Sequence, residues 1–313
     1  MNMKKYLVFA AALILAVSCG RKEDGSLIGE YSPSQEYAFS GFNKIKTISS
    51  GNCGTFDIML VKAKEYGVSM ELPALNPGKG FEIRQKGNTL VLKATKISKK
   101  MRGYGPAKVV IATPAAEGIS LDGANKLRVD GEFSAKKMAF NLSGASELGY
   151  IQGSCQELDI ELSGASRLTA VNINSGECEL KASGASDASY CTLTGPELDI
   201  TLSGASKAIG LETSSKALKV SLSGSSALGV NNGKEMDSVQ AKVSGSSSFT
   251  ITGPSCKEMS VTVSGSSSAD SAELPVESAK VDASGSATVK VNAGSLASET
   301  SGAADVKNVA GAR

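Results

Sequence analysis

The tetrapeptide Ser-Gly-Ala-Ser recurs along this chain at an almost constant spacing. Measured at the first serine, the intervals between eight copies are 20, 20, 20, 20, 21, 20 and 20 residues. The first four copies read SGAS, and the later ones read SGSS or SGSA. A fixed period of about 20–50 residues is the signature of a solenoid or another repeat architecture. The copies begin at Ser143, Ser163, Ser183, Ser203, Ser223, Ser244, Ser264 and Ser284.

Apolar and polar residues alternate strictly between these tetrapeptides, as in LDIEL at 158–162 and MSVTV at 259–263. A period of two is typical of a strand with one buried face. A unit of this length cannot bury that face alone, but stacked units can, with rungs about 4.8 Å apart. We therefore predict an all-β fold, a single-stranded parallel β-helix (β-solenoid) with rungs of about 20 residues. About nine or ten rungs would make a rod roughly 45 Å long.

The glycine of each copy is predicted to turn a corner of the rung. A corner needs either a positive φ or a very close approach of two backbones, and glycine allows both. The flanking serines are expected to bond to the backbone of the corner. The predicted corner column comprises Gly144, Gly164, Gly184, Gly204, Gly224, Gly245, Gly265 and Gly285.

The start of the chain has the pattern of an export signal. Two lysines precede an apolar run over residues 6–17, which is too short to span a membrane comfortably. The sequence AVSC that ends at Cys19 resembles a bacterial lipobox. We therefore predict a lipoprotein signal peptide over residues 1–18 and a lipidated Cys19, whose lipid would anchor the protein in the outer membrane.

Composition divides the remaining chain into four predicted parts. Residues 19–36 are polar and would carry the lipid on a tether. The Lys-Glu-Asp within them resembles a surface-export signal, which would favour the cell surface over the periplasm, and the periplasm stays the alternative. Residues 37–106 would form an irregular β-rich N-terminal portion or cap. The repeat β-helix would cover 107–302, and 303–313 would be a C-terminal tail.

The charge balance excludes one class of partner. The chain has 33 basic and 31 acidic residues, and removal of residues 1–18 takes away two lysines and leaves 31 of each. Without a basic excess to neutralise phosphates, nucleic acid is not an expected partner. The oligomeric state stays open at this stage.

The residue types in this sequence give little support for a catalytic site. The chain has no histidine, which removes the commonest general base and a common metal ligand. Ser206 precedes Lys207, but eight near-identical serine turns favour a structural role over a Ser-Lys mechanism. We predict no catalytic residue, no metal and no cofactor, and hence no enzyme. Five cysteines follow Cys19, and we expect them to be small buried hydrophobic residues: Cys53, Cys155, Cys178, Cys191 and Cys256.

A polysaccharide-binding or polysaccharide-cleaving protein remains the alternative. Asp159 and Asp199 share a repeat column, with Glu179 assigned to a neighbouring column between them. Two rungs separate the aspartates by about 10 Å, wider than glycosidase carboxylate pairs, so a solvated outer face is expected. Tyr150 and Tyr190 also share a column, but alternation does not fix the direction in which they point.

Three stretches together resemble a known family. They are YAFSGFNKIKTISSGNCGTFDIMLVKA at 37–63, FEIRQKGNTLVLKA at 81–94, and the repeated LSGAS. They resemble the family described as putative auto-transporter adhesin, head GIN domain, whose members are exported β-helical proteins and often Bacteroidetes lipoproteins. The resemblance implies a non-enzymatic, lipid-anchored envelope protein that presents a β-helical surface for adhesin-like binding or scaffolding. It brings no catalytic residues, and the partner would be a glycan or an extracellular protein.

Overall fold

The computed structural model describes residues 31–49, 54–73, 80–95 and 105–310, and all regular elements within these ranges are β-strands. The predicted signal peptide, Cys19 and Cys53 lie outside the described residues. The strands are β1 (Gln35–Tyr37), β2 (Lys44–Ser49), β3 (Phe56–Lys62), β4 (Gly67–Glu71), β5 (Phe81–Lys86), β6 (Thr89–Ala94), β7 (Ala107–Thr113), β8 (Gly118–Leu121), β9 (Lys126–Asp130), β10 (Glu132–Leu142), β11 (Glu147–Gly149), β12 (Gln152–Leu162), β13 (Arg167–Thr169), β14 (Asn172–Ala182), β15 (Thr192–Thr194), β16 (Glu197–Leu202), β17 (Lys207–Thr213), β18 (Ala217–Leu222), β19 (Ala227–Asn232), β20 (Met236–Val243), β21 (Ser248–Thr252), β22 (Cys256–Val263), β23 (Ser268–Ala283), β24 (Thr288–Thr300) and β25 (Asp305–Asn308).

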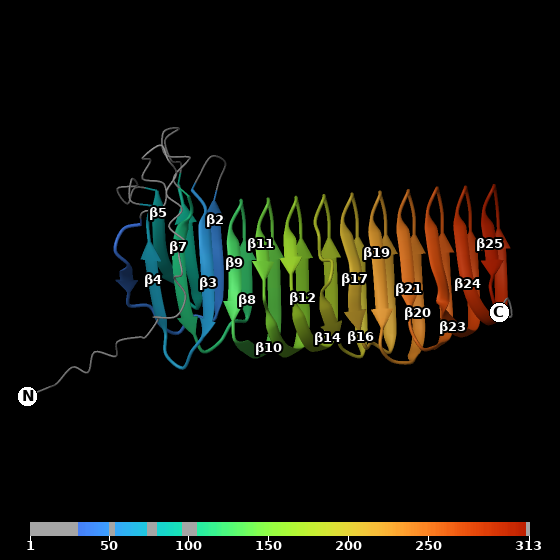
Figure 1. Ribbon diagram of the computed structural model, residues 1–313, viewed down its shortest axis with the longest axis horizontal. Helices are drawn as coiled ribbons and strands as arrows, with labels where there is room; N and C mark the ends of the chain where they lie inside the picture. The colour runs from blue at the N-terminus through green and yellow to red at the C-terminus, as the bar shows by residue number, and fades with distance from the viewer. Residues whose placement is uncertain (1–30, 50–53, 74–79, 96–104, 311–313) are drawn as a thin grey trace, which may run out of the picture.

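The strands stack as successive rungs of a rod, as Figure 1 shows from β8 and β9 to the last rung at β25. Neighbouring rungs pair in parallel, and residues 20 positions apart lie side by side, as in the series Phe140, Ile160 and Leu180. The predicted parallel β-solenoid with 20-residue rungs is confirmed. The register follows from the sequence because a slip of one residue would turn every apolar side chain outward.

The N-terminal end of the rod does not follow chain order. β2 lies between β6 and β8, and β3 lies between β7 and β9. The rung of β6 and β7 therefore stacks on one side of the earlier rung of β2 and β3. The chain then crosses to the other side, where β8 and β9 begin the regular rod. Antiparallel strands cover this end: β5 pairs with β6, and β4 lies between β7 and β1. Phe42 from the Phe-Ser-Gly-Phe segment is buried here and packs on Tyr66, with ring centroids 4.9 Å apart.

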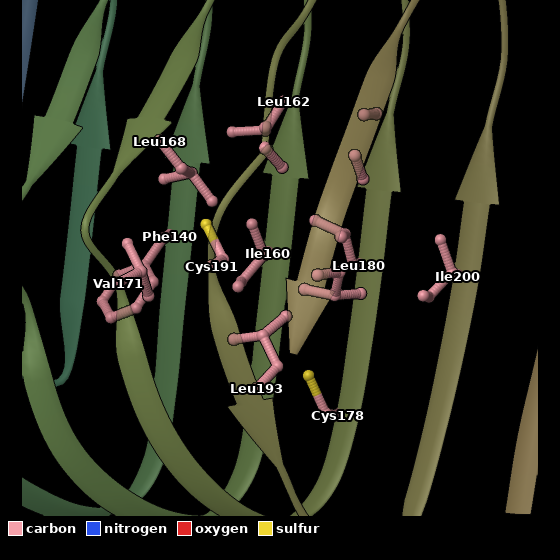
Figure 2. Close-up of a cluster of buried hydrophobic side chains, with 14 of the residues drawn as sticks. Phe140, Ile160, Leu162, Leu168, Val171, Cys178, Leu180, Cys191, Leu193 and Ile200 are labelled. Atoms are coloured by element: carbon pink, nitrogen blue, oxygen red, sulfur yellow. The ribbon is translucent and has the colours of Figure 1, made fainter. Parts of the chain in front are cut away.

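The interior is a set of apolar columns that run along the rod axis. One column contains Phe140, Ile160, Leu180 and Ile200, each at most 2% exposed, and Figure 2 shows them pointing inward from neighbouring strands. Cys178 occupies the place that Leu158 and Leu198 take in the adjacent rungs. Each rung therefore packs its apolar side chains against those of the rungs above and below as well as across the interior, so the rungs stabilise one another.

The glycine corners bring the backbones of successive rungs into contact. All eight predicted corner glycines have φ between 71° and 80°, and Gly123 and Gly302 extend the column at its two ends with φ of 70° and 73°. A Cβ at any of the eight would lie 2.8 Å or less from the carbonyl oxygen of the glycine one rung earlier. That oxygen accepts a hydrogen bond from the next rung, as in Ala205 N to Gly184 O at 2.7 Å. Side chains are thus excluded both by the φ angle and by the neighbouring backbone.

A glycine-to-alanine comparison separates these two causes. Gly204→Ala should lower the free energy of unfolding by several kcal/mol, because its Cβ would meet Gly184 O at 2.6 Å in addition to the φ strain. Gly87→Ala is the matched control, since Gly87 has φ +59° but no atom within 4 Å of its Cβ position, and it should cost only about 1–2 kcal/mol. Urea denaturation measures both. Equal costs would contradict the role of the close backbone approach.

Candidate functional site

The repeated serines serve the corners rather than chemistry. The second serine of each SGAS or SGSS copy is buried, with an exposure of 2% or less from Ser146 to Ser267. In five copies its hydroxyl donates to the carbonyl oxygen of the first serine, as in Ser206 Oγ to Ser203 O at 2.6 Å. A buried hydroxyl that is bonded to the backbone of its own turn is not placed to attack a substrate.

Removal of one such hydroxyl should have a small effect. The hydroxyl proton of Ser206 is shared between Ser203 O at 2.6 Å and Ala182 O at 3.1 Å. Ser206→Ala deletes this interaction without changing the backbone, so the free energy of unfolding should fall by about 1 kcal/mol. Chemical denaturation measures this, with Ser203→Ala as the control because the Ser203 hydroxyl makes no hydrogen bond to the part of the chain that the structure describes. A loss of several kcal/mol in the Ser206 variant would show that the serine column carries more of the fold than the glycines do.

The buried cysteines are protected thiols. Cys178 and Cys191 lie in the interior (Figure 2), and Cys256 is buried farther along the rod. Cys155, which was predicted to be buried, is only partly buried because it lies where β12 leaves the alternating apolar pattern. Burial raises the pKa of the Cys178 thiol to about 12 and the pKa values of Cys191 and Cys256 to about 11. They therefore stay protonated at neutral pH, where only the thiolate would be nucleophilic.

These pKa shifts predict a pH dependence. The folded state keeps these thiol protons to a higher pH than the unfolded state, whose thiols titrate near 9.0. The resulting stability is fully present below about pH 9 and is lost as the pH rises through 11 to 12. Iodoacetamide at pH 8 should leave the three peptides unmodified until urea unfolds the protein.

Alanine variants provide the control for that measurement. Replacement of Cys178, Cys191 and Cys256 by alanine should flatten the decline of the free energy of unfolding between pH 8 and 11. Any decline due to surface lysines would persist in the variant. Rapid labelling of these thiols in the folded protein would contradict their burial.

A shallow concavity of about 490 Å³ lies on the outer face over β12, β14, β16, β18 and β20. Its carboxylates come from two columns. The register corrects one sequence expectation: Glu179 lies in the same column as Asp159 and Asp199, directly between them, because all three are 20 residues apart. The carboxylates are Glu157, Asp159, Glu177, Glu179, Glu197 and Asp199.

Lysines pair with most of this carboxylate face. Lys137 contacts Glu157 and also Asp159, the latter at 2.6 Å, while Lys219 lies 2.8 Å from Asp199. Lys219 donates a hydrogen bond to Asp199, which raises the pKa of Lys219, and the hydrogen bonds that Lys137 donates to Asp159 and Glu157 raise the pKa of Lys137. Lys181 pairs in the same way with Glu179 at 2.7 Å. Among the described residues, no group of three or more acidic or cysteine side chains is arranged to hold a metal ion.

A second corner of the rod carries exposed tyrosines. Tyr150 lies between β11 and β12, and Tyr190 precedes β15; their exposed fractions are 58% and 79%. Three non-glycine residues of the described chain have a positive φ: Tyr150 at 62°, Ala170 at 52° and Tyr190 at 58°. Gly210 continues the series one rung later with φ 67°. We call Tyr150, Ala170, Tyr190 and Gly210 the tyrosine corner.

Local contacts hold this corner in place. The amide of Tyr190 donates to Ile209 O at 2.9 Å, and the carboxylate of Asp187 accepts from the Ser189 amide at 3.0 Å. The ring of Tyr190 lies over Gly210, where an added Cβ would come within 3.0 Å of it. The column ends at Gly210, since the pairing of β17 with β19 shifts register between Ala208 and Leu211. A bulky residue in the left-handed region costs about 1–3 kcal/mol, so both tyrosines lie in strained positions.

Sequence alternation left the direction of the tyrosines open, because a corner residue belongs to neither face of a strand. One signal was present nonetheless. Gly210 shares their column, and a glycine in a column of corners indicates the positive φ that turns these side chains outward.

Comparison with known proteins supports the fold. The model of the family described as putative auto-transporter adhesin, head GIN domain, matches residues 54–209 and 191–312. The solved structure of a putative adhesin from Parabacteroides merdae is similar, with 12% identity, a TM-score of 0.54, and coverage of 90% of this chain and 97% of that one. A putative adhesin from Parabacteroides distasonis has 14% identity, a TM-score of 0.50, and coverage of 90% and 98%. No curated protein matches the sequence.

Proposed function

Because this chain belongs to the auto-transporter adhesin head GIN domain family, we propose that it is a non-enzymatic, adhesin-like binding protein of the outer membrane, held by a lipid on Cys19. The family indicates an envelope or cell-surface protein. The lipid anchor and the surface orientation come from the N-terminal sequence, with a periplasmic orientation as the alternative.

The regular outer surface is the observation that carries this proposal. Polar side chains of successive rungs bond to each other in ladders along the rod, for example Thr194 to Asn174 at 3.4 Å and Thr252 to Asn231 at 2.9 Å. Ion pairs follow the same direction, as between Lys257 and Asp237 at 2.7 Å. Such a surface offers the same groups repeatedly at the rung spacing, so it suits an extended ligand that makes many weak contacts.

The chemistry of the candidate groups supports binding over catalysis. The serine hydroxyls are bonded within their turns, and burial raises the pKa of the interior thiols. On the outer face, lysines pair with Asp159, Glu179 and Asp199. The sequence left polysaccharide binding or polysaccharide cleavage as the alternative function. The exposed Tyr150 and Tyr190 support binding, whereas no observation supports cleavage.

Anchoring is proposed to depend on Cys19. Within the described ranges, no helix has the length and apolar character needed to cross a membrane. The apolar run at 6–17 and the AVSC sequence ending at Cys19 support attachment through a lipid.

The proposal predicts adhesion that depends on the anchor. Bacteria that express the full chain should bind to mucin-coated or fibronectin-coated surfaces and to epithelial cells. Cys19→Ala should abolish cell-associated protein and adhesion together, because the polypeptide loses its lipid. Adhering cells are counted, and the protein is followed by immunoblot.

Protease treatment of intact cells provides the control for orientation. Added proteinase K should remove the lipidated protein and the adhesion while a periplasmic marker persists. Full protection of the protein would place it inside the outer membrane and contradict the adhesin role.

A further inference from the structure

We propose that Tyr150 and Tyr190 form a glycan-binding site, in which their rings stack on sugar residues of a neutral oligosaccharide that lies along the rod axis. The inference deepens the proposed adhesin function and depends on it, since it names the class of ligand and the place where the ligand binds.

The backbone geometry at the tyrosine corner indicates that the two tyrosines serve a function other than stabilising the fold. The same column accepts Gly210, which adopts its φ of 67° without strain, and the other corner of the rod uses glycine in all eight SGAS-type copies. The fold therefore does not require an aromatic side chain at this place. Two tyrosines at positive φ nevertheless occupy it, and strained residues of this kind cluster at binding sites.

The exposure of the rings leaves them available to a ligand. The described chain has five exposed large apolar or aromatic side chains, and three of them, Tyr150, Tyr190 and Ile209, lie at this one corner region. The ring of Tyr190 rests over Gly210 and remains 79% exposed. An exposed aromatic ring attracts the apolar C–H face of a sugar while its hydroxyl remains in water.

The spacing of the rings fits a chain of sugars. Two rungs separate Tyr150 from Tyr190, which corresponds to about 10 Å along the axis. An extended β-linked glycan advances by a comparable distance over two sugar residues. One sugar would then lie on each ring, and the sugar between them would face the small side chain of Ala170.

The flanking side chains have the hydrogen-bonding groups that sugar hydroxyls require. Gln152, Asn172 and Thr192 form a column beside the corner and contribute amide and hydroxyl groups. Nearby charges are balanced in sign: Arg167 lies 3.9 Å from Asp187 and Lys126 lies 3.1 Å from Glu147. The next rung adds one charge of each sign, Lys207 and Glu212. A surface without excess charge favours a neutral glycan over a sulfated or uronic-acid polymer.

The test compares three variants of the full lipoprotein in detergent. The probes are biotinylated cellohexaose, xylohexaose, mannohexaose and laminarihexaose, and binding is measured by biolayer interferometry. The double variant Tyr150→Gly/Tyr190→Gly should lose about 100-fold in affinity for the hexasaccharide that binds, roughly tenfold per ring. Its melting temperature should stay the same or rise, because glycine removes the φ strain.

Two control variants isolate the aromatic rings. Val110→Ala shortens an exposed apolar side chain of β7, away from the tyrosine corner, so it should keep the affinity of the parent protein. Tyr150→Phe/Tyr190→Phe should also retain most of the affinity, because stacking uses the ring rather than the hydroxyl. A lower melting temperature of the double glycine variant would overturn the inference by showing that the tyrosines support the fold.

Adhesion of protein-coated beads to mucin and to fibronectin distinguishes failure of this inference from failure of the proposed function. Beads that adhere, with none of the four hexasaccharides binding or with adhesion unchanged in the double glycine variant, would overturn the glycan site and leave the adhesin role standing. Adhesion that survives periodate oxidation of the surface would indicate a protein partner and overturn the site likewise. Beads that adhere to nothing would overturn both.

Discussion

The close approach of successive backbones at the glycine corners is the constraint on which this structure depends. Each corner amide donates to the carbonyl of the preceding glycine, and the eight repeat corners leave no room for a Cβ. The rung spacing set there lets the interior columns from Leu121 to Ala283 pack without interruption. Buried side chains supply the hydrophobic stabilisation, but the corner fixes the geometry in which they meet.

The repeat made most of the rod predictable from sequence. A 20-residue period combined with period-two alternation determines the parallel pairing, the interior face and the corner glycines, since each follows from local geometry. The same period already placed Glu179 in the column of Asp159 and Asp199, although it was first assigned to a neighbouring one. The N-terminal rungs were not predictable, because β2 pairs with β6 and β8 through long-range contacts in a segment without a period.

At the tyrosine corner the sequence departs from the residue type that the backbone geometry prefers. Glycine is accommodated at position 210, yet tyrosine occupies positions 150 and 190 at a cost in backbone strain. Strain that the fold does not require is the physical reason to place binding at this corner. The carboxylate face lacks such a signal, because lysines of neighbouring strands pair with it.

Native-state hydrogen exchange tests the central role of the corners most directly. The amides of Ala145, Ala165, Ala185 and Ala205 lie in surface turns but donate to glycine carbonyls at 2.6–2.7 Å. They should exchange only through global unfolding, with the same free energy of opening as amides of β12 and β14. Exchange through local opening, at the rate of ordinary surface turns, would contradict the account and place the stability of the rod in the side chains alone.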